Sequence, residues 1–365
     1  MRVLLVEPYY GGSHGAWADG YVASSRHDVE LLTHEAQFWR WRLQGAHLTL
    51  AEELVARNDR FNVVLASSML DLAGFLGAAR SVLSAVPAAV FFHENQLAYS
   101  TDSGGREEHA VALINWQSAA VADRVFFNST FHRDRFFAEV PVLHNRFPDR
   151  QHGSLLGRVE RASSVLPVGV DLQRLDEVAT PAGDESPLLL WNHRWDRDKG
   201  PGEFAALVTD LFEAGVDFRL ALAGEQFVTD PEEFSALGSL LGDQLIHYGF
   251  ADDDRYVELL RAADVVVSTA HQEFFGVALT EAVYAGGFPV VPNRLVYPER
   301  ISDRFHERCL YDGHGDLVAK TRWALEHAAA ARLIAADQHE VMAAYDWSVV
   351  APIYDDELEE MASGR

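Results

Sequence analysis

The chain has 365 residues, of which 48% are hydrophobic, 23% charged and 11% aromatic. This composition is typical of a globular protein of two or three domains and excludes a disordered or collagen-like chain. The formal net charge of −25 at pH 7 argues against nucleic-acid binding over the whole surface, because phosphate would be repelled.

The sequence also excludes several kinds of site and location. A single cysteine, Cys309, excludes a disulfide framework and a metal site built from several thiolates. No apolar run approaches the roughly 18 residues of a transmembrane helix, and the first residues have the pattern of a strand, not of a secretory signal. We therefore expect a cytoplasmic protein with no membrane partner.

The first half alternates short apolar segments with helical patterns. Strands are predicted for residues 2–7, 63–67, 88–93 and 124–128, because each segment is short, β-branched or aromatic, and ends in polar residues. Residues 110–122 have helical spacing. Strands that alternate with helices indicate a parallel sheet with crossover helices.

The second half repeats this alternation after a turn-rich stretch, TPAGDESP. We predict an N-terminal domain at 1–171, a linker at 172–187, a C-terminal domain at 188–350, and a last helix at 351–365 that packs back on the N-terminal domain. The long helical tail should break at Pro352. The predicted C-terminal strands are 188–191, 218–223, 245–248, 264–268 and 288–291, and the predicted helices are 202–213, 255–262, 278–285 and 317–327. The expected class is α/β, with two doubly wound, Rossmann-like domains facing a central cleft and ligands at the carboxyl ends of the strands.

Two polar segments follow predicted strands of the first half. Gly11 and Gly12 could let the backbone approach an anion, or they could form a structural turn. His93, Glu94 and Asn95 end another strand, where a histidine could hydrogen-bond a sugar or transfer a proton.

The second half has two further candidates. Arg194 and Lys199, one of only two lysines, could both reach a diphosphate or could belong to a solvated loop. Asp196 and Asp198 match a metal-binding DxD triplet, a pattern that is common by chance. Glu273 and Glu281 begin and end an element about 12 Å long, which suits two carboxylates at opposite ends of a nucleotide-sugar. Amides near residues 275 and 276 would lie between them and meet the diphosphate.

These motifs resemble those of a known family. Gly169–Asp171, Arg194 with Lys199, Gly224, Gly249, the Glu273-x7-Glu281 element and the proline-valine strand at 289–291 resemble glycosyltransferase family four, which has the GT-B fold. The segments YGGSH (10–14), FWRWR (38–42), FHENQL (92–97), EFFGVA (273–278), EAVY (281–284) and LVYPE (295–299) are similar to the tRNA-queuosine α-mannosyltransferases.

The resemblance implies a retaining transfer of mannose from GDP-mannose to the cyclopentenediol of queuosine at the wobble position of a tRNA. No metal or cofactor is implied, because arginine and lysine take the place of the cation. The implied catalytic residues are His93 at the mannose, Arg194 and Lys199 at the leaving diphosphate, and Glu273 at the mannose O3/O4 edge. The implied donor-binding residues are Gly11, Gly12, Tyr248, Gly249, Phe250, Phe274, Phe275, Gly276 and, at the ribose hydroxyls, Glu281.

A tRNA partner requires basic or aromatic surface on this acidic chain. Residues 126–161 contain six arginines with interleaved phenylalanines and with three histidines, His132, His144 and His152, that could add charge at lower pH. Residues 38–42 form a second such segment. The alternative is that the aromatic residues are core and the arginines are solvated. The predicted acceptor residues are His14, Trp39, Arg40, Arg42, Glu94, Asn95, Arg133, Arg135 and Arg146.

Two other functions stay open. The same fold and donor chemistry could act on a lipid or small-glycoside acceptor, which the acidic balance favours. The chain could also be a non-catalytic nucleotide- or RNA-binding module, against which the four charged donor-site residues argue.

Overall fold

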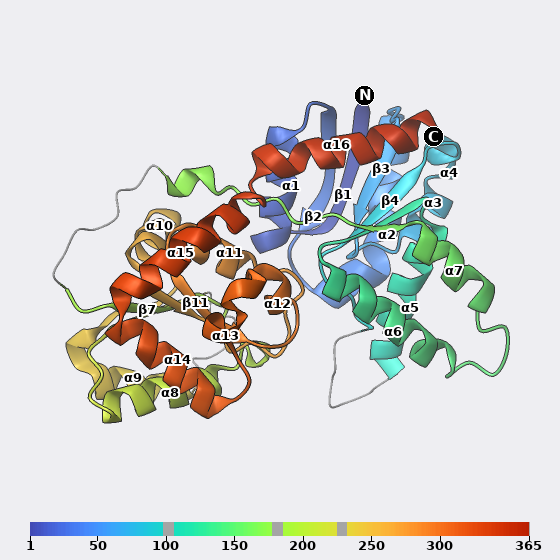
Figure 1. The fold of residues 1–365 in the computed structure, drawn as a ribbon. Coiled ribbons are helices and arrows are strands. Elements are labelled where there is room, and N and C mark those ends of the chain that lie inside the picture. Colours follow the sequence, from blue (N-terminus) through green and yellow to red (C-terminus); the bar gives the residue numbers. More distant parts are fainter. Residues whose placement is uncertain (98–105, 177–184, 225–231, 365) are drawn as a thin grey trace. The chain divides into compact units, whose positions relative to one another are not determined.

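The computed structural model describes residues 1–97, 106–176, 185–224 and 232–364. The chain forms two compact units, one of Met1–Val170 with Trp347–Arg365 and the other of Asp171–Asp346 (Figure 1). Residues 177–184 of the predicted linker lie outside the described residues. Its earlier part, by contrast, includes a short 3-10 helix, Gln173–Leu175, that belongs to the second unit.

The first unit is built on a six-stranded parallel sheet with the order β2-β1-β3-β4-β5-β6. Its strands are β1 (Arg2–Tyr10), β2 (Asp28–Glu35), β3 (Val63–Ser67), β4 (Ala88–Phe92), β5 (Arg124–Phe127) and β6 (Ser163–Val165). Its helices are α1 (Gly12–Ser24), α2 (Trp39–Arg57), α3 (Leu72–Ala78), α4 (Arg80–Leu83), α5 (Arg106–Val121), α6 (Thr130–His144), α7 (Gly153–Arg161) and α16 (Trp347–Ser363).

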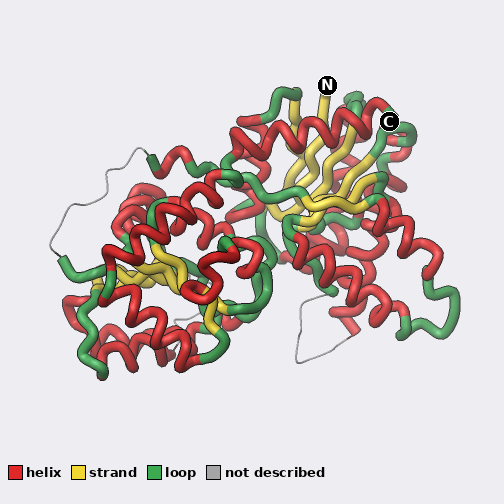
Figure 2. Tube along the Cα trace, viewed as in Figure 1, coloured by secondary structure: helices red, strands yellow, loops and turns green. Residues whose placement is uncertain are grey.

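The inner strands β1, β3, β4 and β5 are apolar along most of their length because helices cover both faces of the sheet (Figure 2). Side chains alternate between the faces, so Leu4 and Val6 pack with α2, α3 and α5. On the other face, Phe91 stacks on Trp17 of α1 at 5.0 Å and meets Tyr354 of α16 at 5.7 Å. The last helix is thereby part of the core of the first unit.

The second unit has the same design, with the strand order β12-β11-β10-β7-β8-β9. Helices α8, α9 and α14 cover one face of the sheet, and α10, α11 and α15 cover the other (Figure 1). The strands are β7 (Leu188–Trp191), β8 (Arg219–Ala223), β9 (Leu245–Gly249), β10 (Val265–Val267), β11 (Phe288–Pro292) and β12 (Leu310–Tyr311). The helices are α8 (Pro201–Glu213), α9 (Glu232–Leu241), α10 (Asp253–Ala262), α11 (Val277–Tyr284), α12 (Tyr297–Arg300), α13 (His306–Cys309), α14 (His314–Glu326) and α15 (Ala328–Ala343).

The predicted break of the helical tail was placed wrongly. The chain leaves the helical conformation after Ala343, and Pro352 lies inside α16. The buried carboxylate of Asp355 fixes α16 to α1, because it accepts hydrogen bonds from the hydroxyls of Tyr21 and Ser25. Tertiary contacts of this kind decide where the helix continues, and the position of a proline alone does not.

The strand order locates the edge where ligands bind. In the first unit the direction of winding reverses between β1 and β3, and in the second unit it reverses between β7 and β10. Ligands of doubly wound sheets bind beyond the carboxyl ends of the strands at such a reversal. Every predicted catalytic residue follows one of these strands or a direct neighbour.

Candidate active site

In the second unit, the loops after β7 and β10 bring Lys199 and Glu273 together. The Lys199 ammonium donates hydrogen bonds to the Gln272 carbonyl at 2.8 Å and to the Glu273 carboxylate at 3.2 Å. The Lys199 side chain is only 11% exposed, so its charge is held inside the loops. The turn that places it requires Gly200, whose φ is +65° and whose Cβ, if present, would lie 2.4 Å from the Thr269 carbonyl oxygen.

The Glu273 carboxylate is held in its ionised form. Burial alone would raise its pKa, but Lys199, together with smaller contributions from His193 and the Phe275 amide, outweighs burial and lowers the pKa to about 2. Its Oε1 accepts hydrogen bonds from the amides of Phe274, Phe275 and Gly276, at 3.0, 3.2 and 3.0 Å. These are the amides that the sequence suggested for a diphosphate, and in this structure the Glu273 side chain occupies them.

Arg194 also follows β7, and its guanidinium donates to Asp198 at 3.1 Å. The Arg194 side chain is 45% exposed, whereas Asp198 is nearly buried and also lies 3.5 Å from Lys199. Asp196 accepts a hydrogen bond from the Arg197 amide at the start of a 3-10 turn. Asp198 is therefore paired with two cations and Asp196 caps a turn, which does not favour the DxD interpretation.

Glu281 lies on α11 and is almost buried. Its two oxygens accept hydrogen bonds from Arg174 at 2.5 Å and from the Tyr256 hydroxyl at 3.0 Å. Asn192 donates to that hydroxyl in turn. Burial raises the pKa of Glu281, and Arg174 and Tyr256 offset part of that effect. The sequence pattern did not identify Arg174 or Tyr256, because they follow no motif and meet Glu281 only in the folded chain.

The other predicted donor residues differ in exposure. Tyr248 and Phe250, on either side of Gly249 at the end of β9, are 38% and 71% exposed and present aromatic surface. Phe274 and Phe275 are buried, so their side chains belong to the core and only their backbone could contact a ligand.

In the first unit, His14 lies between two carboxylates. Its Nδ1 is 2.9 Å from Glu7 and its Nε2 is 3.5 Å from Glu94. Burial would lower the pKa of His14, but the two glutamates outweigh it and raise the pKa to about 10. The ring is therefore an imidazolium near neutral pH. Glu7 was missed by the sequence analysis, because it lies inside the first apolar strand.

His93 stands next to this charged ring, with centroids 4.3 Å apart, and its edge meets Trp17. Burial and then the charge of His14 hold the pKa of His93 well below its usual value, so it is neutral. Glu7, His14 and His93 also bring three potential metal-ligand atoms within 4.8 Å of one another. Because both nitrogens of His14 face carboxylates, a proton accounts for this cluster without a metal.

The structure also places Gly11, Gly12 and Asn95. Gly12 begins α1 with φ +52°, and Gly11 precedes it against Ala36. A Cβ on Gly11 would lie 2.6 Å from the Ala36 Cβ. Asn95 is fully buried beyond the end of β4.

In the arginine-rich segment, Phe126, Phe127 and Phe136 belong to the core, as the alternative interpretation held, whereas Phe147 is exposed. Phe136 is fully buried, so it cannot stack on a nucleotide base. His132 and His144 are also buried, and burial lowers the pKa of His132 to about 3. The expected charging of His132 at mildly acidic pH is therefore wrong, and burial together with His152 also lowers the pKa of His144. The predicted arginines lie on the surface with local partners: Arg133 with Asp134, Arg135 with Glu139 and Arg146 with His109.

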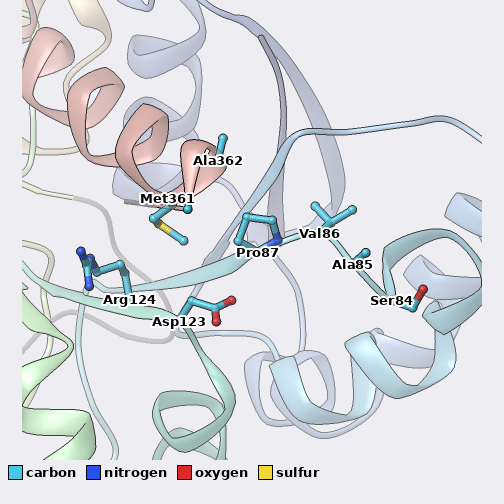
Figure 3. A pocket seen from close by; sticks show the side chains of 9 residues that line it. Ser84, Ala85, Val86, Pro87, Asp123, Arg124, Met361 and Ala362 are labelled. Atoms are coloured by element: carbon cyan, nitrogen blue, oxygen red, sulfur yellow. The ribbon is translucent and has the colours of Figure 1, made fainter.

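The segment at 38–42 begins α2 and is more exposed. The Arg40 guanidinium lies 4.7 Å from the Trp39 ring centroid, and Arg42 donates to the Glu35 carbonyl. A separate hollow in the first unit, between Pro87, Arg124 and Met361, lies at the amino ends of β4 and β5 (Figure 3). It is therefore at the opposite edge of the sheet from His14 and His93.

Comparisons with known proteins cover both units of the chain. Residues 2–170 match a family described as tRNA-queuosine alpha-mannosyltransferase N-terminal, and residues 174–339 match one described as glycosyl transferases group 1. A sucrose-phosphate synthase from Thermosynechococcus elongatus has a TM-score of 0.73 at 15% identity, with 100% of each chain covered. The HepE protein of Anabaena, solved with UDP and glucose, has a TM-score of 0.68 at 15% identity, again with 100% of each chain covered.

These structural likenesses confirm the predicted α/β class and GT-B fold. None of the helices in the described part of the chain combines the length and the hydropathy needed to cross a membrane. The tRNA-queuosine alpha-mannosyltransferase of Drosophila melanogaster is 35% identical over 307 residues, which are 82% of this chain and 81% of that protein. On this identity and coverage, the chain belongs to the tRNA-queuosine alpha-mannosyltransferase family.

Proposed function

We propose that the chain transfers mannose from GDP-mannose to the cyclopentenediol of queuosine in a tRNA, with retention of configuration. Membership of the family supports the acceptor and the sugar. The observation that carries the donor chemistry is the buried Lys199–Glu273 pair beside Arg194, at the edge of the sheet where doubly wound folds bind nucleotides.

Glu273 serves as a fixed hydrogen-bond acceptor for sugar hydroxyls. A carboxylate whose pKa is about 2 is a weak base at neutral pH, so it is poorly suited to remove a proton. One of its oxygens already accepts three amide hydrogen bonds, which makes it a poor nucleophile. A double displacement of the kind used by retaining hydrolases needs a nucleophilic carboxylate and a second group that serves as acid. Glu273 fits neither role.

The reaction then proceeds on one face of the sugar. The bond between mannose C1 and the β-phosphate oxygen breaks, and C1 bonds to the acceptor hydroxyl oxygen on the same face. The hydroxyl proton passes to the departing phosphate oxygen, and GDP leaves. Arg194 and Lys199 stabilise the charge that develops on the diphosphate, Glu281 accepts hydrogen bonds from the ribose, and neutral His93 contacts the mannose.

A transfer assay tests this proposal. The protein is incubated with radiolabelled GDP-mannose and two tRNA pools, one with queuosine and one from cells that cannot make it, with UDP-glucose in parallel. We expect label only in the queuosine pool and only from GDP-mannose, with no added metal. Label in neither pool, together with slow hydrolysis of GDP-mannose, would contradict the tRNA acceptor and favour a lipid or small glycoside.

A further inference from the structure

The beginning of α2 exposes two aromatic side chains that the donor chemistry does not use. Phe38 is 76% exposed, and Trp41, at 64%, is the most exposed tryptophan in the described part of the chain. A single exposed apolar residue is ordinary, but two large rings within one helical turn leave apolar surface that folding has not buried. Such surface indicates a site of contact with another molecule.

The backbone at Phe38 is strained. Phe38 precedes α2 with φ 50° and ψ 55°, in the left-handed region that a bulky side chain rarely adopts. Its carbonyl accepts the amides of Trp41 and Arg42 at 2.8 and 3.1 Å, so this conformation starts the helix while the ring stays in solvent. Strain of this kind is concentrated at functional sites.

The Trp41 ring packs against its own helix at Gly45. A Cβ placed on Gly45, one turn further along, would lie 3.1 Å from Cη2 and from Cζ2 of the Trp41 ring. The ring therefore lies against the helix where glycine leaves room for it. This contact limits the orientations of an exposed side chain and presents the rest of the ring as a surface.

The charge around these rings suits a polyanion. Residues 35–42 contain two arginines, Arg40 and Arg42, and one acid, Glu35. Among the described residues neither guanidinium forms an ion pair, whereas the arginines of α6 do so with adjacent carboxylates. A segment with excess positive charge is unusual in a chain whose net charge is −25.

The segment also lies beside the acceptor side of the first unit. Ala36 packs against Gly11, and Glu35 pairs with Tyr10 in the register of β2 and β1. The loop after β1 leads directly to His14. The rings therefore stand next to the edge of the sheet where the candidate acceptor residues lie.

We propose that Phe38 and Trp41 form a stacking surface for unpaired bases of the RNA acceptor, with Arg40 and Arg42 contacting its phosphates. Single-stranded RNA is bound in this way, by aromatic faces that accept bases and by arginines that follow the backbone. The proposal rests on the proposed function only in taking RNA as the acceptor. It assigns the contact to the rings at 38 and 41, in addition to the residues predicted from the sequence.

Direct binding tests the surface independently of catalysis. A fluorescein-labelled anticodon stem-loop RNA is titrated with wild-type protein and with Trp41→Ala, Trp41→Phe, Gly45→Ala and Leu48→Ala variants. Stacking on one base corresponds to roughly 5- to 150-fold in affinity, so we expect Trp41→Ala to weaken binding by that factor. Trp41→Phe should recover most of it. Leu48→Ala, on the same helix and 60% exposed, is the matched control and should bind as the wild type does.

The Gly45→Ala variant distinguishes a change in the RNA-binding surface from a loss of folding stability. Its methyl group displaces the Trp41 ring without removing it, while alanine favours the helix over glycine. We expect weaker RNA binding with a Tm that is unchanged or higher, a combination that a folding defect would not produce.

The outcomes keep the two proposals distinct. Equal RNA affinity of Trp41→Ala and wild type would overturn the stacking surface, whether or not mannose is transferred. If Trp41→Ala binds the RNA more weakly than wild type does, but the wild-type protein transfers no mannose to tRNA, the stacking surface is supported and the proposed function is contradicted. The wild-type protein could also prove to be a dimer that becomes monomeric in the Trp41→Ala variant while RNA affinity stays unchanged. That result would assign the surface to a second copy of the chain and overturn the inference.

Discussion

The charge of His14 predicts how the stability of the first unit depends on pH. The pKa of His14 is raised from 6.5 to about 10 in the folded chain, because Glu7 and Glu94 hold the protonated ring despite its burial. Between these two values the folded state binds one more proton than the unfolded state does. The contribution of protonated His14 to the free energy of unfolding is therefore fully present below about pH 6.5 and is lost as the pH rises toward 10.

The magnitude follows from the same interval. At ~1.4 kcal/mol per pH unit, the range from 6.5 to about 10 corresponds to about 5 kcal/mol as an upper bound. A variant His14→Gln keeps a hydrogen-bond donor beside Glu7 but has no charge. We therefore expect it to be less stable than wild type by up to about 5 kcal/mol near pH 6, and by little near pH 10.

Urea unfolding of wild type, His14→Gln and His34→Gln across this pH range provides the measurement. His34 hydrogen-bonds Thr49 on the surface of the same unit and serves as the control. Following each transition by fluorescence and circular dichroism shows whether the two units unfold together. A difference between wild type and His14→Gln that stays constant from about pH 6 to 10 would refute the charged His14.

Three further predictions concern catalysis. Glu273→Gln should lower kcat/KM by about 10²-fold or more while GDP affinity, measured by calorimetry, changes little; a large loss of GDP affinity would contradict its place at the sugar. Arg174→Met removes the cation that offsets the raised pKa of Glu281, so the KM for GDP-mannose should rise more steeply with falling pH than in wild type, and equal pH profiles would speak against this coupling. EDTA should leave transfer unchanged, whereas a loss that Mn²⁺ restores would indicate a cation at the DxD triplet or beside His14.

The sequence predicted the parts of the site that follow strands in short, local motifs. Lys199 and Glu273 were candidates because each stands in a strand-to-helix loop, and the resemblance to a family implied their roles. The parallel sheet brings those loops together at the β7–β10 reversal. The fold class was predictable for the same reason, since apolar strands that alternate with helices leave few topologies.

Contacts between distant segments were not predictable in this way. Glu7 looks like any residue of a buried strand until α1 brings His14 to it, and Arg174 looks like part of a linker until it meets Glu281. The phenylalanines of residues 126–161 were ambiguous because interleaved aromatic and basic residues are typical both of RNA-binding surface and of an amphipathic helix. Burial assigns Phe136 to the core and leaves Phe147 on the surface, and burial depends on the tertiary fold.

The polar groups described above in each unit share a property that bears on the proposed reaction. Glu273 is a fixed negative charge because its pKa is about 2, and His14 is a fixed positive charge because its pKa is about 10. His93 stays neutral beside that charge, since its pKa lies well below the usual value. None of the three exchanges a proton readily near neutral pH, so in the proposed reaction they orient hydroxyl groups and stabilise charge without serving as acid or base. In that proposal the proton of the acceptor goes to the phosphate oxygen released from mannose C1, which is the base that the reaction itself supplies.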